Sequence, residues 1–172
     1  MKRTKWFDRK FPIMEDNGVL PSIIERLAGC PVRIEEIIRN TNSSLLEIKP
    51  EGKWSIKEHI GHLGDLELLW LGRMDDFEKR LPELRAADLT NKKTNEANHN
   101  TIDADVLIEQ FRERRMQFVS KLKNLSNEQL QARSLHPRLK TPMRIIDHAY
   151  FAAEHDDHHL ASVTEIILSN IK

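Results

Sequence analysis

The chain has 172 residues, and its 27 lysine and arginine residues balance its 27 aspartate and glutamate residues. A neutral chain lacks the excess positive charge that follows a nucleic-acid backbone, and no apolar stretch approaches the roughly 20 residues of a membrane-spanning helix. We therefore expect no nucleic-acid partner and no membrane segment.

The length suits one domain, and we expect residues 1–172 to fold as one unit with a short, basic and aromatic N-terminal arm. That arm lacks the apolar core of a signal peptide, which favours a cytoplasmic location. The single cysteine, Cys30, has no partner for an internal disulfide and lies in a helical pattern. We predict that it is a packed thiol and not a nucleophile.

Helical periodicity begins early in the chain. Apolar residues recur at three- and four-residue spacing over residues 20–40, which predicts a first helix that can bend near Pro31. The next helix, predicted over residues 55–79, has a clearer start, because Ser55 and Glu58 have the spacing of a capping box. Its apolar residues are numerous enough for a central member of a bundle.

A long connection is predicted over residues 81–101, which are polar and short of apolar side chains. Such a length can cross a bundle from end to end or cover a site as a lid. A solvated or disordered linker is the third interpretation, and the sequence does not choose among them.

The last two helices are predicted over residues 103–125 and 141–170. The second of these has Thr141 as a cap and Pro142 at its first helical position, after a loop over residues 134–140. On the earlier helix we expect a solvated charged face that contains Arg112, Arg114 and Arg115. Four long amphipathic helices and no convincing strand predict an all-α fold, a four-helix bundle.

The most informative residues are two histidines, His155 and His159, which lie four residues apart in the last predicted helix. This spacing puts both side chains on one helix face, about 6 Å apart along the axis, where they can bind one metal ion. Neighbouring apolar residues share that face, so the pair should point inward. His158 falls on the polar side and is predicted to be solvated, whereas His148, on the inner face, is either part of the site or a core histidine.

A catalytic metal site usually has three protein ligands and one open position, so the second helix should supply a further ligand. Both His62 and His59 lie close to its apolar face, and spacing alone leaves the choice open. Asp65 and Glu58 are candidate second-shell acceptors that would fix a histidine tautomer, or they are simply surface and helix-start carboxylates. Arg73 lies further along the same helix face as His62. We expect its charge to be solvated and not to pair with an anionic group.

The segment 54–65 reads WSIKEHIGHLGD, and residues 155–159 read HDDHH. Together they resemble the two signatures of the DinB/YfiT-like superfamily, in which a Trp-Ser/Thr helix start is followed eight residues later by a metal-binding histidine. Counting from Trp54 gives His62. The segments 5–11 and 21–27 also resemble a subgroup of this family, so the resemblance covers nearly the whole chain.

The resemblance implies a four-helix bundle with one divalent metal ion, zinc or nickel, held by His62, His155 and His159 in a cleft. It also implies a homodimer and a small-molecule substrate. Some relatives use low-molecular-weight thiols such as bacillithiol or mycothiol, and others look like metal-dependent hydrolases. The zinc-protease motif is absent, because Asp156 stands where that motif has glutamate.

Three neutral histidines and an open position would activate either water or a thiol, so the site predicts a hydrolase or a thiol S-transferase. No residue separates these two reactions, and the catalytic residues beyond the metal ligands are unknown. A non-catalytic, metal-stabilised helical binding or stress-response module is the alternative. A fourth ligand from a protein carboxylate would favour that alternative.

Overall fold

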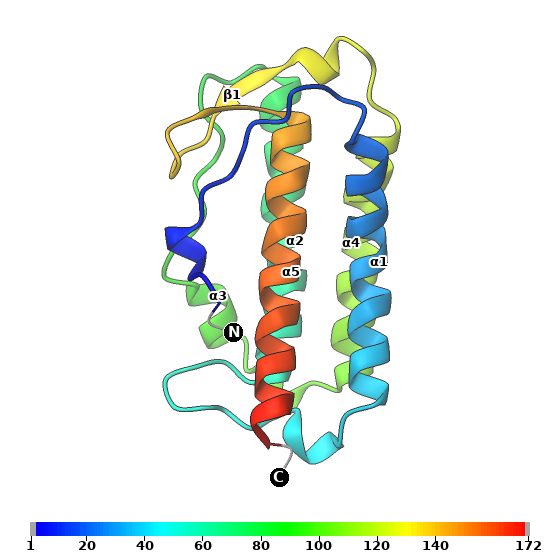
Figure 1. Ribbon diagram of the computed structural model, residues 1–172, viewed down its shortest axis with the longest axis vertical. Coiled ribbons are helices and arrows are strands. Elements are labelled where there is room, and N and C mark those ends of the chain that lie inside the picture. Colours follow the sequence, from blue (N-terminus) through cyan, green and yellow to red (C-terminus); the bar gives the residue numbers. More distant parts are fainter. Residues whose placement is uncertain (1–2, 171–172) are drawn as a thin grey trace.

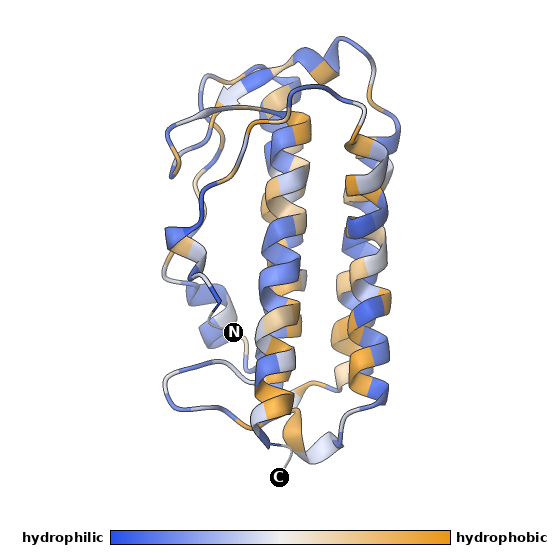
Figure 2. Cartoon of the chain, viewed as in Figure 1, coloured by the Kyte–Doolittle hydropathy of each residue, from blue (hydrophilic) through white to orange (hydrophobic). Residues whose placement is uncertain are grey.

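The computed structural model describes residues 3–170. Its four long helices lie side by side as a bundle: α1 (Leu20–Arg39), α2 (Ile56–Glu78), α4 (Ala104–Lys123) and α5 (Ile145–Asn170) (Figure 1). Hydrophilic and hydrophobic residues alternate along each ribbon, as expected for helices with one face in a core (Figure 2). The predicted four-helix bundle is confirmed, and no helix within residues 3–170 is long and apolar enough to cross a membrane.

The first two helices begin and end close to the predicted residues. α1 continues unbroken through Pro31. At the start of α2 the predicted capping box is present, because the Ser55 hydroxyl accepts from the Glu58 amide at 3.1 Å and the Glu58 carboxylate accepts from the Ser55 amide at 2.9 Å. This pair satisfies two of the amide groups that a helix start leaves without partners.

The start of the last helix differs from the prediction. Two short strands, β1 (Arg133–Leu135) and β2 (Pro142–Arg144), form an antiparallel pair, and α5 begins only at Ile145. The predicted cap at Thr141 and the predicted absence of strands were therefore wrong. Met143 explains the extended conformation, because its side chain is buried while its two neighbours in β2 are not.

The connection between α2 and α4 crosses the bundle from end to end. Ser55, before α2, contacts Asn100, before α4, at 2.6 Å, and Asp75 pairs with Lys121 near the other ends of these helices at 2.5 Å. α2 and α4 therefore run parallel. Residues 79–103, which connect these two helices, must therefore run back along the whole length of the bundle. This confirms the first of the three interpretations, a connection that crosses the bundle from end to end.

This connection is folded against α2 and contains the short helix α3 (Lys92–Glu96). It approaches α2 closely at two glycines. A β-carbon at Gly61 would lie 2.3 Å from the His99 ring, and one at Gly72 would lie 2.0 Å from the Arg85 guanidinium group. A larger residue at Gly61 would displace the His99 ring, and one at Gly72 would displace the flexible end of the Arg85 side chain.

The core consists of two apolar clusters, one toward each end of the bundle. The predicted packed thiol, Cys30, is buried in one of them. Between the clusters lies a buried ion network of Arg115 from α4, Glu67 from α2 and Asp156 from α5. Arg115 donates to Glu67 at 2.6 and 3.0 Å, to both oxygens of Asp156, and to the Leu27 carbonyl of α1 at 3.2 Å. All four helices meet at this guanidinium group.

The predicted solvated position of Arg115 was therefore wrong, since its exposed fraction is 0%. Arg112 and Arg114 are partly exposed, and Arg112 pairs with Glu35 and Glu109 near the surface. Burial raises the pKa of Glu67 to about 7, although Arg115 acts in the opposite direction. The network is compatible with the core because each charge has a hydrogen-bonded partner.

We predict that Arg115→Met lowers the free energy of unfolding by about 3–5 kcal/mol, because two carboxylates would lose their buried partner. Urea denaturation followed by circular dichroism measures this change. The control is Arg112→Met, which removes a partly exposed pair and should cost no more than about 1 kcal/mol. Equal effects of the two substitutions would contradict the central role of Arg115.

Candidate metal centre

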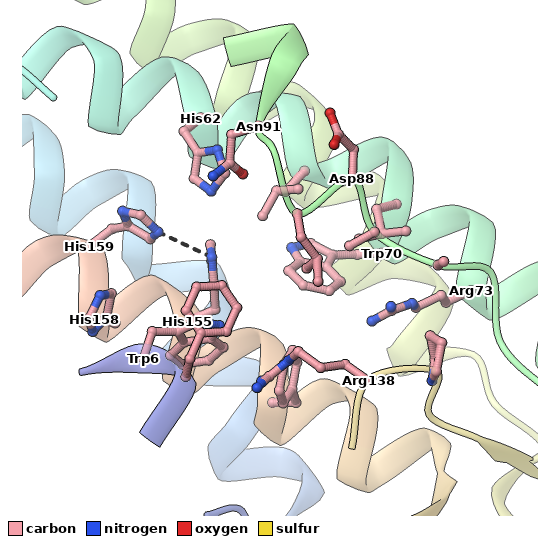
Figure 3. Close-up of a pocket in the computed structure, with 18 of the residues that line it drawn as sticks. Trp6, His62, Trp70, Arg73, Asp88, Asn91, Arg138, His155, His158 and His159 are labelled. Carbon is pink, nitrogen blue, oxygen red and sulfur yellow. Dashed lines mark hydrogen bonds between the residues drawn. The ribbon is translucent and has the colours of Figure 1, made fainter. Parts of the chain in front are cut away.

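Three histidines converge at one place in the bundle. His62 comes from α2, and His155 and His159 come from successive turns of α5 (Figure 3). Each offers a ring nitrogen that lies within 4.8 Å of the others, and all three residues are buried. The structure thus brings together the three residues that the sequence predicted as metal ligands.

The geometry of this cluster fits a divalent metal ion. The Nε2 atoms of His155 and His159 face each other at 3.1 Å, close to the separation of about 3.3 Å expected for two nitrogen ligands of one tetrahedral ion. His155 Nδ1 is buried with no hydrogen-bond partner within residues 3–170. Three imidazoles are a donor set that zinc and nickel accept.

Burial keeps these histidines neutral. It lowers the pKa of His62 to about 3 and the pKa values of His155 and His159 well below the ordinary range, and neighbouring histidines act in the same direction. A neutral imidazole has a free nitrogen lone pair, which is the form that binds metal.

A chain of hydrogen bonds sets the tautomer of His62. The Thr94 hydroxyl donates to Asp65 at 3.3 Å and lies 3.0 Å from His62 Nδ1, so it accepts the Nδ1 proton and leaves Nε2 free. Asp65 is in turn held by Lys93 and His99, each at 3.0 Å. Asp65 therefore acts on His62 through Thr94. The sequence did not point to Thr94, because this threonine lies in the long connection, about 30 residues after His62.

His59 lies behind the cluster. Its Nδ1 atom is 2.8 Å from Nδ1 of His159. Burial lowers its pKa to about 4, so a neutral His59 can accept the Nδ1 proton of His159 and leave the Nε2 atom of His159 free. The structure places His62 within the histidine cluster and His59 beside it, against His159.

The other candidate residues lie elsewhere. Glu58 belongs to the capping box and pairs with Lys49 at 2.7 Å. His148 packs in the core, 5.5 to 5.9 Å from the rings of Trp70, Phe77 and Phe118. His158 was predicted to be solvated, but it is half-buried and its ring lies 5.5 Å from that of Trp6.

The cluster opens into a cavity of about 320 Å³. All three tryptophans of the chain, Trp6, Trp54 and Trp70, line it. Residues 86–89 and 91 of the long connection form another wall, so the connection also covers the site, as its second interpretation proposed. Arg73, from α2, lines the cavity as well. Its predicted solvated position was wrong, because only 1% of it is exposed.

Comparison with known proteins agrees with this structure. The family model of the DinB superfamily matches residues 26–163, and the chain belongs to that superfamily. Among solved structures, a similar one is YfiT from Bacillus subtilis, described as a probable metal-dependent hydrolase with an unusual four-helix bundle topology. It has a TM-score of 0.79 and 19% sequence identity, over 92% of this chain and 91% of that chain. None of the curated proteins matches the sequence.

The burial of His148 predicts how the free energy of unfolding depends on pH. Burial lowers its pKa well below the ordinary value, so below about pH 6.5 the unfolded chain takes up a proton that the folded chain does not. The folded state is therefore destabilised as the pH falls. For metal-free protein, His148→Leu should reduce the loss of unfolding free energy between pH 7.5 and 5 by about 2 kcal/mol. Urea denaturation at both pH values measures this difference, and identical losses in the two proteins would contradict it.

Proposed function

We propose that this protein is a metal-dependent hydrolase that holds one divalent ion, zinc or nickel, on His62, His155 and His159. The observation that carries the proposal is a cluster of three buried, neutral histidines that opens into a cavity of about 320 Å³. A closed structural site would have no need for such a cavity. The description of YfiT as a probable metal-dependent hydrolase supports the same reaction class.

A divalent ion with an open position supplies a Lewis acid that makes water, or a thiol, nucleophilic near neutral pH. The residues of the chain prepare that position. Thr94 and His59 orient two of the ligand rings, and the Trp54 ring lies 4.5 Å from that of His62. The Trp54 indole is fixed in turn, because it donates to Asn95 at 3.0 Å. These contacts hold the rings in one geometry and exclude bulk water from one side of the cluster.

The composition of the cluster supports catalysis over a purely structural role. Within residues 3–170, the group of possible ligands contains three histidines and no carboxylate. Asp65 is engaged by Thr94, Lys93 and His99, and Glu58 belongs to the capping box. A fourth position is thus left to an exogenous ligand such as water or substrate.

Metal binding tests the ligand assignment. We expect alanine at His62, His155 or His159 to abolish tight binding of zinc and nickel, measured by calorimetry and by the metal content of protein purified without an affinity tag. His59→Ala should weaken binding about 10- to 100-fold, because it removes only the outer partner of His159. The control, His148→Leu, should bind as the unsubstituted protein does. Stoichiometric metal in a His155→Ala/His159→Ala double variant would refute the site.

Activity tests the reaction class. We expect metal-loaded protein to hydrolyse members of a panel of esters and amides, to lose this activity with a chelator, and to recover it with zinc or nickel. Parallel assays with electrophiles and low-molecular-weight thiols identify an S-transferase if consumption of the electrophile requires the thiol. Metal binding without either activity, combined with a protein carboxylate as fourth ligand, would point to the binding module instead.

A further inference from the structure

Two arginines line the cavity away from the histidine cluster. Arg73 follows His62 by eleven residues on α2, which is about 16 Å along the helix axis, and its guanidinium group lies 5.6 Å from the Trp70 ring. Arg138, from the turn after β1, lies 5.8 Å from the Phe151 ring. Figure 3 shows Arg73 beyond Trp70 as seen from His62, and Arg138 across the cavity on the side of Trp6.

Neither arginine has a carboxylate within ion-pairing distance among residues 3–170. Of the two acidic residues closest to Arg73 along α2, Asp75 pairs with Lys121 at 2.5 Å and Asp76 pairs with Arg85 at 2.7 Å. Asp88 lies on the cavity wall, but its oxygens accept from Thr90 and Lys92. Neither positive charge therefore has a direct ion pair, although Asp76 acts on Arg73 at longer range.

His136 adds a third donor between them. Its Nδ1 atom accepts from the amides of Arg138 and Leu139, at 3.2 and 3.1 Å. Burial lowers its pKa to about 3, so the ring is neutral and its single proton must be on Nε2. Nε2 lies 3.3 Å from Nη1 of Arg73, and two donors therefore face each other with no acceptor.

Arg73 Nε donates to the Arg85 carbonyl at 3.1 Å, but the other donors of these groups have few partners and are buried. Only 1% of Arg73 and 2% of His136 are exposed, and the Nη2 atom of Arg138 is buried with no hydrogen-bond partner within residues 3–170. Burial also lowers the pKa of Arg73 to about 10 and lowers the pKa of Arg138. Buried charges of this kind are costly unless an opposite charge is nearby, and an oxyanion supplies both the charge and the missing acceptors.

We infer that Arg73, His136 and Arg138 form an oxyanion subsite, and that the substrate is a small amphipathic acid. Its carboxylate or phosphate group binds this subsite, its apolar part lies along Leu66, Trp70 and Phe151, and its reacting bond reaches the histidine cluster. The placement of the reacting bond rests on the proposed function. Binding of the anionic group does not, because it uses a separate set of residues.

Hexanoate, hexyl phosphate and hexanol are suitable probes, tested on metal-free protein by calorimetry and tryptophan fluorescence. Fluorescence reports directly on the cavity, since all three tryptophans line it. We expect both anions to bind at least tenfold more tightly than hexanol, because charge-assisted hydrogen bonds are the strong ones. The tighter of the two anions identifies the subsite as one for carboxylate or for phosphate.

Arg138→Gln and Arg73→Met should each weaken anion binding at least tenfold and leave hexanol binding unchanged. The matched control is Arg133→Gln, an exposed arginine of the same hairpin that does not line the cavity. Arg138 is only half-buried, so its variant keeps the test decisive if Arg73→Met fails to fold.

Equal binding of hexanol and the two anions, or anion binding insensitive to Arg138→Gln, would overturn the inference. Anion binding that appears only after metal is added and ignores both arginines would overturn it too, since the anion would then bind at the histidines. Anion binding that needs the arginines, in a protein that never binds metal, would refute the proposed function and leave the oxyanion subsite intact.

Discussion

The structure depends most on the guanidinium group of Arg115. It lies between the two apolar clusters and binds groups from α1, α2 and α5, so that one side chain of α4 fixes how the other three helices are placed. Asp156, one of its partners, directly follows His155. Fixing Asp156 fixes the rotation of α5, and therefore the direction in which His155 and His159 face. A charged network in the core thus holds the histidine cluster in place, although its residues are not part of the cluster.

The parallel arrangement of α2 and α4 also affects the site. A short turn cannot join parallel neighbours, so the chain must cross the bundle between them. That crossing segment carries Thr94 to His62 and forms one wall of the cavity. It remains close to α2 because Gly61 and Gly72 leave room for it. The topology therefore supplies groups that complete the site.

Burial lowers the pKa values in both parts of the cavity, but the resulting charge differs. It keeps the clustered histidines neutral, which leaves their nitrogen lone pairs free to bind a metal, because an imidazole can lose its proton. The guanidinium groups of Arg73 and Arg138 remain charged despite their lowered pKa values, because arginine holds its proton far above neutral pH. One cavity consequently combines neutral donors for a metal with positive charge for an anion.

The sequence by itself determined what local spacing controls. It predicted the four helices, the capping box at Ser55 and the shared face of His155 and His159, because periodicity and caps act within a few residues. The tertiary structure decided what depends on other helices. Helical spacing does not distinguish His59 from His62, and the position of α5 puts His62 in the cluster and His59 beside His159. Burial of Arg115 and Arg73 was equally hidden, since a charged residue is expected at the surface unless partners from distant parts of the chain, or a ligand, compensate it.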